Sequence, residues 1–332
     1  MACAQTGSGK TAAFMVPIVS RLTEEKVVSN KVEAGTRDTV HPECVVVTPT
    51  RELAKQIQQQ AKKFSQGTEL RAVVVYGQTS VYHQMEDIRN GCNILVATPG
   101  RLNHFIENGT VSLKNVKVLV LDEADRMLEE GFMAEIEKAV TNGSMANVGE
   151  RQTLMFSATF SDSVQEAAQA FLKDYFFLTV GLVGAICGDV ELAFHEVEST
   201  TKRETLEEIL SDEKRDPKER TMIFVGVSLM IAILTVSMSF VLQKKTTADY
   251  LTAYLSGEGL PAVSIHGDRA QRQREEALAD FASGKYPILV ATSVAGRGLD
   301  IPLVQHVINY DMPHEVDEYV HRIGELFVKY FP

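Results

Sequence analysis

The stretch Ala4-Gln5-Thr6-Gly7-Ser8-Gly9-Lys10-Thr11 decides the fold of this chain. It fits the phosphate-binding loop pattern that ends in Gly-Lys-Ser/Thr, with Ala4 standing where the pattern has its first glycine. Glycines let successive backbone N–H groups point into one concavity that suits an anion, and the next helix adds the positive end of its dipole. In such a loop Lys10 reaches the outer phosphates and the Thr11 hydroxyl holds Mg²⁺. The alternative is a Gly/Ser turn before an amphipathic helix.

Length and composition place the chain among globular proteins. Its 332 residues suggest two domains, and an apolar fraction of 45% is enough to bury real cores. The net charge of −11 and the pI of about 5.3 exclude a general basic field that would attract nucleic acid. Binding of such a partner therefore has to come from local contacts.

The cysteines and the N-terminus indicate a cytosolic protein. Cys3, Cys44, Cys92 and Cys187 are far apart and show neither a disulfide framework nor a zinc-ligand spacing. No charged segment followed by an apolar one marks a secretory signal. A phosphate loop should follow a strand, yet only three residues precede it, so we expect the first strand to be cut short and the gene product to be incomplete.

Apolar β-branched runs alternate with segments of helical spacing along most of the chain, which predicts an α/β fold with parallel sheets covered by helices on both faces. The predicted strands are 45–47, 72–76, 93–97, 116–121, 152–156, 191–197, 221–225, 262–265, 287–291 and 305–310. The predicted helices are 10–25, 52–64, 81–89, a short one from 101, 133–140, 202–210, 246–255 and 271–281. The glycine-rich residues 181–190 read as a linker between domains 1–180 and 191–332.

Acidic residues follow the strand that ends at Leu121. Open α/β sheets bind ligands at the carboxyl ends of their strands. At that position Asp122 can hold Mg²⁺ through its water ligands, and Glu123 can orient and deprotonate an attacking water. The alternative is a solvated acidic helix start, because Asp and Glu are common in first turns.

Three further strand ends carry hydroxyl or arginine side chains. Ser157-Ala158-Thr159 can relay changes from a nucleotide site, or can be an ordinary helix cap. Pro49-Thr50-Arg51 and Thr98-Pro99-Gly100-Arg101 join a hydroxyl, an arginine and a helix start, which are groups that suit sugar-phosphate oxygens. Taken alone, each of these two segments also fits an ordinary turn without a ligand.

Together, AQTGSGKT, PTRELA, TPGR, DEAD and SAT resemble the motifs of the DEAD-box RNA helicases in order and spacing. The second half adds Ser264–Arg269, Ala291–Ile301 and His321–Gly324 to the resemblance. Between motifs, residues 151–157 and 183–190 look most like the Vasa branch, the germline helicases. The resemblance covers the chain except residues 226–243 and 325–332.

This resemblance implies two RecA-like domains and an ATP-dependent RNA helicase that uses ATP and Mg²⁺ and locally unwinds RNA. Family members hold single-stranded RNA by its sugar-phosphate backbone without sequence specificity, and no DNA specificity is expected. The resemblance further implies a cytoplasmic protein with germ-granule proteins as partners.

The matching motifs also imply roles for individual residues. Catalysis would rest on Lys10, Asp122 and Glu123. The nucleotide would be bound by Ala4, Gln5, Thr6, Gly7, Ser8, Gly9, Lys10, Thr11 and Asp300, with Thr11 and Asp122 holding Mg²⁺. Coupling of hydrolysis to strand separation would rest on Ser157, Thr159, His321 and Arg322. The RNA track would be lined by Pro49, Thr50, Arg51, Gly77, Thr98, Gly100, Arg101, Gly267, Gln271, Arg274, Thr292 and Arg297.

Three departures from the family pattern change these expectations. The adenine-reading aromatic and Gln of the family would precede Met1, so we expect weak discrimination between ATP and GTP. The Gly-Gly of the first domain is Gly77-Gln78 here, which weakens a close backbone approach to RNA. The closing motif continues as Glu325–Pro332 where the family has two arginines. An arginine finger contributes about 10³–10⁵ to rate in GTPases, so turnover should be impaired. The alternative function is a clamp that holds ATP and RNA without cycling.

The stretch 221–242 carries no charged residue and is long enough to span a bilayer, which makes a membrane-associated product a second alternative. Topology argues against a span, because it would separate the strand 221–225 from its following helix. Removal of 226–243 joins Val225 to Lys244 and restores the strand-to-helix turn of the family. We therefore interpret 226–243 as an insertion, and we expect it to form an apolar helix that projects from the second domain.

Overall fold

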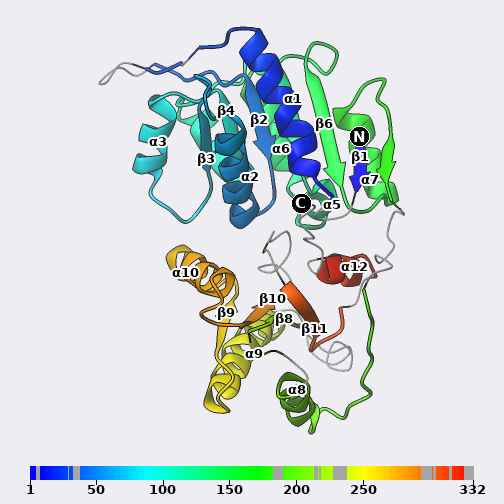
Figure 1. The fold of residues 1–332 in the computed structure, drawn as a ribbon. Coiled ribbons are helices and arrows are strands. Elements are labelled where there is room, and N and C mark those ends of the chain that lie inside the picture. The colour runs from blue at the N-terminus through cyan, green and yellow to red at the C-terminus, as the bar shows by residue number, and fades with distance from the viewer. Residues whose placement is uncertain are drawn as a thin grey trace. The chain divides into compact units, whose positions relative to one another are not determined.

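The apolar runs form two separate parallel sheets in the computed structural model of the chain. The structure describes residues 1–4, 8–28, 30–32, 38–181, 190–212, 216, 218–226, 238–292, 301, 304–313 and 316–324. Two units divide the chain, Met1–Gly184 and Ala185–Pro332, and each contains one of the sheets (Figure 1).

Unit 1 is built on a seven-stranded sheet with the order β3-β4-β2-β5-β6-β1-β7. Its strands are β1 Ala2–Ala4, β2 Cys44–Val47, β3 Ala72–Val75, β4 Ile94–Ala97, β5 Val118–Leu121, β6 Gln152–Ser157 and β7 Leu178–Val180. The strand pairs are parallel, which confirms the predicted α/β class.

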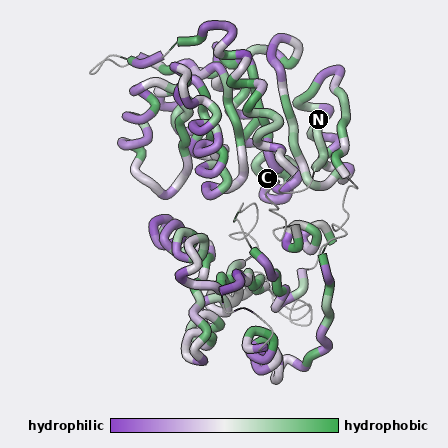
Figure 2. The backbone as a smooth tube through the Cα atoms, viewed as in Figure 1, coloured by the Kyte–Doolittle hydropathy of each residue, from purple (hydrophilic) through white to green (hydrophobic). Residues whose placement is uncertain are grey.

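Helices cover both faces of this sheet. They are α1 Lys10–Glu24, α2 Arg51–Phe64, α3 Val81–Arg89, α4 Pro99–Glu107, α5 Ala124–Glu129, α6 Met133–Asn142 and α7 Asp162–Phe171. Cys44 and Val46 of β2 pack with the apolar residues of α1 and α2, whereas Val45 and Val47 pack with those of the remaining helices. Because neighbouring residues of a strand face opposite sides, continuous apolar strands supply two cores at once. Figure 2 shows this apolar character along the central strands.

The first strand is short. Ala2–Ala4 forms β1, which pairs with β6 and with β7, and the truncation of a longer strand stays a prediction. Ala2 lies opposite Phe156 on one side and Leu178 on the other. The sequence did not predict β7, α5 or α7.

Unit 2 is built on a four-stranded parallel sheet with the order β11-β8-β10-β9. Its strands are β8 Arg220–Val225, β9 Ala262–Ile265, β10 Ile288–Thr292 and β11 Val304–Asn309. Its helices are α8 Lys202–Leu210, α9 Met238–Gly257, α10 Gln271–Ala282 and α12 Val316–Gly324. The predicted strand 191–197 is wrong. Its residues are exposed and pair with no strand in the described part of the chain, and β propensity alone does not make a strand without a partner.

Much of the predicted insertion 226–243 lies outside the described residues, so its projecting helix stays a prediction. The described part of α9 begins at Met238 and contains the predicted helix 246–255. Within the described ranges, no helix combines enough length and apolarity to cross a bilayer. Residues 182–189 of the predicted linker and the tail 325–332 also lie outside the described part.

Arg322 of α12 is buried inside unit 2, with an exposed fraction of 1%. Its Nη1 donates to Asn309 Oδ1 at 3.0 Å and to the Asp311 carbonyl oxygen at 2.7 Å, and its Nη2 pairs with Glu318 Oε1 at 2.7 Å. The guanidinium also lies 5.2 Å from the ring centroid of Phe224 in β8. One side chain thus ties α12 to the strands.

We expect Arg322→Met to lower the free energy of unfolding by about 3–5 kcal/mol, because it leaves buried acceptors without their cation. Denaturant unfolding measures this change. Arg272→Met removes an exposed arginine of α10 that pairs with Glu276, and it should change stability by less than about 1 kcal/mol. Equal stability of the two variants would contradict the structural role of Arg322.

Candidate functional site

The described end of the phosphate loop leads into α1 through Gly9, which has φ +87° and precedes the helix as its N-cap. That left-handed conformation favours glycine. Lys10 is the first residue of α1, and its Nζ donates to the Ala4 carbonyl oxygen at 2.9 Å. The lysine ammonium is therefore held at the end of β1, the strand that precedes the loop. Gln5, Thr6 and Gly7 lie outside the described residues.

The carboxylates after β5 stand at the end of a central strand. Asp122 is 3% exposed, and burial raises its pKa to about 6 although the positive charge of Lys10 opposes that rise. Glu123 adopts φ +57°, which is a left-handed conformation uncommon for a residue other than glycine. Strained backbone of this kind concentrates at functional sites.

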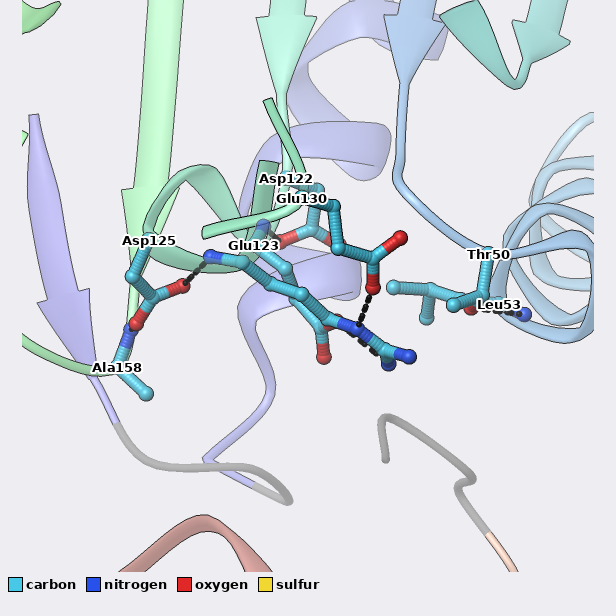
Figure 3. Close-up of polar contacts among 8 residues, drawn as sticks. Thr50, Leu53, Asp122, Glu123, Asp125, Glu130 and Ala158 are labelled. Atoms are coloured by element: carbon cyan, nitrogen blue, oxygen red, sulfur yellow. Dashed lines mark hydrogen bonds and ion pairs between the residues drawn. The ribbon is translucent and has the colours of Figure 1, made fainter. Parts of the chain in front are cut away.

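A buried arginine faces the strained glutamate. Arg126 Nη1 lies 3.8 Å from Glu123 Oε2, and Arg126 Nε donates to Glu130 Oε1 at 2.8 Å. The Arg126 side chain is 3% exposed, so water screens these pairs little. Figure 3 shows Glu123 and Glu130 within this group of contacts. Arg126 of α5 thus holds Glu123, the N-cap of that helix, by charge.

Asp125 joins the loop after β5 to the loop after β6. Its Oδ2 accepts hydrogen bonds from the backbone N–H groups of Ala158 (3.0 Å) and Thr159 (2.9 Å) and from Thr159 Oγ1 (3.0 Å). Figure 3 shows Asp125 next to Ala158. Ser157 Oγ is buried beside them and has no hydrogen-bond partner among the described residues. The predicted coupling residues Ser157 and Thr159 are thus placed next to the acidic motif.

A second feature of unit 1 is a pocket of about 400 Å³. It is lined by Pro49, Arg51, Gly77, Val81, Thr98, Pro99, Gly100, Arg101, His104, Phe132 and Glu135. Six of the residues predicted for the RNA track share this one cavity. Thr50 does not line it, and instead its side chain caps α2 by accepting from the N–H of Leu53 at 3.4 Å.

Sequence reasoning missed several residues that line this pocket or hold its lining in place. Gln84 is buried, and its Oε1 accepts from Arg101 Nη1 at 3.0 Å while Arg101 Nη2 donates to the Thr79 carbonyl oxygen at 3.2 Å. Gln84 therefore fixes the direction of the Arg101 side chain. Glu135 and Phe132 reach the pocket from α6 and its N-cap. Only tertiary packing brings them there, so the motifs gave no signal.

Gln78, the departure from the family pattern, has φ +60° and is exposed. Its Oε1 accepts from Arg51 Nη1 at 2.5 Å. Arg51 Nη2 would lie 3.8 Å from a Cβ built on Gly77. The guanidinium of Arg51 therefore lies over the backbone of Gly77 and is held from outside the pocket by Gln78.

In unit 2, the described residues among those predicted to bind RNA lie at or beyond the carboxyl ends of β9 and β10. Thr292 ends β10, Gly267 follows β9 by two residues, and Gln271 and Arg274 belong to the first turn of α10. Strands β9 and β10 are parallel neighbours, so these residues share one edge of the sheet.

A hydrogen-bond network fixes the turn after β9. Asp249 of α9 accepts from Ser264 Oγ at 2.7 Å and from Arg269 Nη2 at 3.1 Å, and it pairs with His266 Nε2 at 3.0 Å. Burial raises the pKa of Asp249, but the hydrogen bonds from Ser264, His266 and Arg269 together bring it below its ordinary value. The carboxylate thus remains charged and anchors the turn.

Besides Gln5, Thr6 and Gly7, three further predicted residues are not placed. Arg297 and Asp300 lie outside the described residues, as does the side chain of His321. Arg322 was predicted to couple hydrolysis to strand separation, and its guanidinium makes the contacts within unit 2 given above.

A phosphate loop before α1, a parallel sheet covered on both faces and carboxylates at the end of β5 define a P-loop protein with RecA-like units. Residues 1–167 match the DEAD/DEAH box helicase model, and residues 201–325 match the helicase conserved C-terminal domain. The chain belongs to the DEAD/DEAH box helicase family.

Similar proteins include a probable ATP-dependent RNA helicase DDX4 of Sus scrofa, which is 50% identical over 98% of this chain and 42% of its own length. The ATP-dependent RNA helicase vasa of Drosophila melanogaster is 46% identical over 98% of this chain and 44% of its own length. The structure of S. cerevisiae Dbp5 bound to RNA and ADP BeF₃ matches with a TM-score of 0.75 and 25% identity, covering 98% of this chain and 75% of that one. The chain spans less than half the length of these two curated relatives.

We expect Asp125→Asn to destabilise unit 1 by about 2–3 kcal/mol, because its amide would present N–H groups or a weaker acceptor to three buried donors. Thermal unfolding measures the loss. Asp162→Asn changes an exposed acid at the start of α7 and should cost less than about 1 kcal/mol. An Asp125→Asn variant as stable as the parent would contradict this link between the two loops.

Proposed function

We propose that this chain binds ATP and single-stranded RNA and uses ATP hydrolysis to separate short RNA duplexes. The observation that carries the proposal is the pocket of unit 1, which collects two arginines and two helix starts on the same sheet as the phosphate loop. Relatives named as ATP-dependent RNA helicases and a matching structure bound to RNA support this reading.

The residues at the ends of β1 and β5 fit a nucleotide. The first turn of α1 and the ammonium of Lys10 would hold phosphate oxygens, and Thr11 and Asp122 would hold Mg²⁺. Mg²⁺, when bound, would neutralise charge on the phosphates. Glu123 would orient the attacking water, since its strained backbone and the ion pair to Arg126 fix its position. Asp125 would carry changes at this site to Thr159.

The pocket fits a sugar-phosphate backbone. Arg51 and Arg101 offer planar forks that suit phosphate, and the first turns of α2 and α4 offer backbone N–H groups. These contacts do not depend on the bases, so we propose sequence-independent RNA binding. The two arginines act at close range inside the pocket, so RNA can bind there although the net charge of the chain is −11. From the resemblance to the Vasa branch, we further propose that the protein is cytoplasmic and has germ-granule proteins as partners.

We expect Lys10→Ala to lower ATP affinity by about a hundredfold, because it removes a charge-assisted contact to the outer phosphates. Titration with a fluorescent ATP analogue measures the affinity. Lys62→Ala removes an exposed lysine of α2 and should leave it unchanged. Equal ATP affinity of the Lys10→Ala variant and the parent would refute the assignment of the nucleotide site.

A non-cycling clamp is the second candidate, and the sequence of the tail favours it. Residues Glu325–Pro332 stand where the family pattern has two arginines, one of which stabilises charge at the γ-phosphate. In this reading ATP and RNA bind normally but hydrolysis is slow. Steady-state ATPase rates with and without RNA separate the two candidates, because a cycling enzyme is stimulated by RNA.

Replacement of Glu325–Pro332 by an Arg-Thr-Gly-Arg continuation with a further strand and helix should raise RNA-stimulated ATPase roughly tenfold or more. Removal of residues 226–243 belongs in the same variant, because that stretch interrupts the strand-to-helix turn of the family pattern. A matched variant with Ala-Thr-Gly-Ala controls for the added length. If both variants hydrolyse ATP at the parent rate, the tail is not the cause of slow turnover.

A further inference from the structure

Glu135 places a carboxylate inside a pocket whose other charged groups, Arg51 and Arg101, are cations. It comes from the first turn of α6, and its backbone carbonyl accepts from Asn103 Nδ2 of α4 at 2.8 Å. This hydrogen bond fixes the backbone position of Glu135 in α6 relative to helix α4. A Cβ built on Gly100 would lie 3.5 Å from Glu135 Oε2, so the carboxylate touches the first turn of α4.

The start of α4 is where an anion is favoured. Pro99 and Gly100 are its first two residues, and the Thr98 side chain does not cap the helix within the described part of the chain. N–H groups of a first helical turn carry partial positive charge and attract anions. Glu135 Oε2 is buried there and has no hydrogen-bond partner among the described residues. The Oε2 atom therefore brings negative charge to this turn without a hydrogen bond of its own, while Lys138 of the same helix interacts with the carboxylate through charge and has its hydrogen bond with Glu107.

We propose that Glu135 is an internal counter-anion that weakens the binding of an RNA phosphate at the start of α4. This inference rests on the proposed RNA site. A phosphate that enters the pocket gains Arg51, Arg101 and the α4 N-terminus, but it meets the charge of Glu135 beside the same turn. Glu135 thereby limits the affinity of the pocket and favours release of RNA, while the arginines set the geometry of binding.

The test is the affinity of the full chain for a fluorescently labelled 20-nucleotide oligouridylate, measured by anisotropy. Glu135→Gln keeps the shape of the side chain and removes its charge, so RNA should bind about three- to tenfold more tightly at low salt. The gain should shrink as ionic strength rises from about 0.05 to about 0.3 M, because salt screens the repulsion. Glu135→Ala should also bind more tightly.

Two control variants separate this inference from the proposed function. Glu137→Gln removes an exposed carboxylate of the same helix, two residues away, and should leave RNA affinity within about twofold of the parent. Arg101→Ala removes a cation of the pocket and should weaken RNA binding. Thermal unfolding of each variant verifies that it is folded at the temperature of the titration.

The outcomes test the role of Glu135 and the proposed RNA site separately. If the parent binds RNA and Arg101→Ala weakens binding, but Glu135→Gln binds like the parent or more weakly, the role of Glu135 is overturned and the RNA site stands. An equal gain in Glu137→Gln also overturns it, because the effect would then be one of net charge. If Arg101→Ala leaves RNA binding unchanged, the proposed site itself is wrong.

Discussion

The parallel strands β2, β4 and β5 are in register so that their last residues lie side by side, because Val47 pairs with both Ala97 and Leu121. Leu121 pairs in turn with Met155 of β6. The residues that follow these strands therefore leave the sheet at one edge, where open α/β sheets bind ligands. A slip of one residue would turn each side chain to the opposite face and would carry Asp122 away from its neighbours. Because both faces of these strands are apolar, the in/out pattern alone does not fix the register, and close packing of the particular side chains disfavours such a slip.

The same constraint explains how much the sequence could predict. Strands buried on both faces read as continuous apolar runs, so most of their positions were predicted, and residues placed directly after them were found from the sequence. Glu135, which lines the pocket, and Gln84, which holds the lining residue Arg101, were missed because both come from helices, and their positions depend on how those helices pack. The strand expected at 191–197 was wrong for a related reason. A strand needs a neighbour, and local composition does not say whether one is present.

Backbone strain marks positions that composition could not reveal. Glu123 and Gln78 both adopt left-handed conformations, at a cost of about 1–2 kcal/mol each relative to ordinary backbone. Each has an arginine partner, Arg126 for Glu123 and Arg51 for Gln78, and these contacts offset part of the cost. At both positions the strained backbone accompanies a contact that orients a charged side chain, that of Glu123 in one case and that of Arg51 in the other. Sequence propensity fails where such functional geometry overrides it.

Charge sets a further condition on the pocket. An acidic chain repels a polyanion at long range, so in the proposed RNA site the arginines of the pocket would provide attraction at close range, where geometry also matters. Tight binding of the ground state alone does not speed a reaction, and a site that holds RNA too strongly slows its release. In the proposed RNA site, two cations would fix the geometry of binding and one anion would limit the affinity, and together they would meet both needs. The position of Glu135 against Gly100 follows from the packing of α6 on α4, so the same contact that stabilises the fold also places this charge.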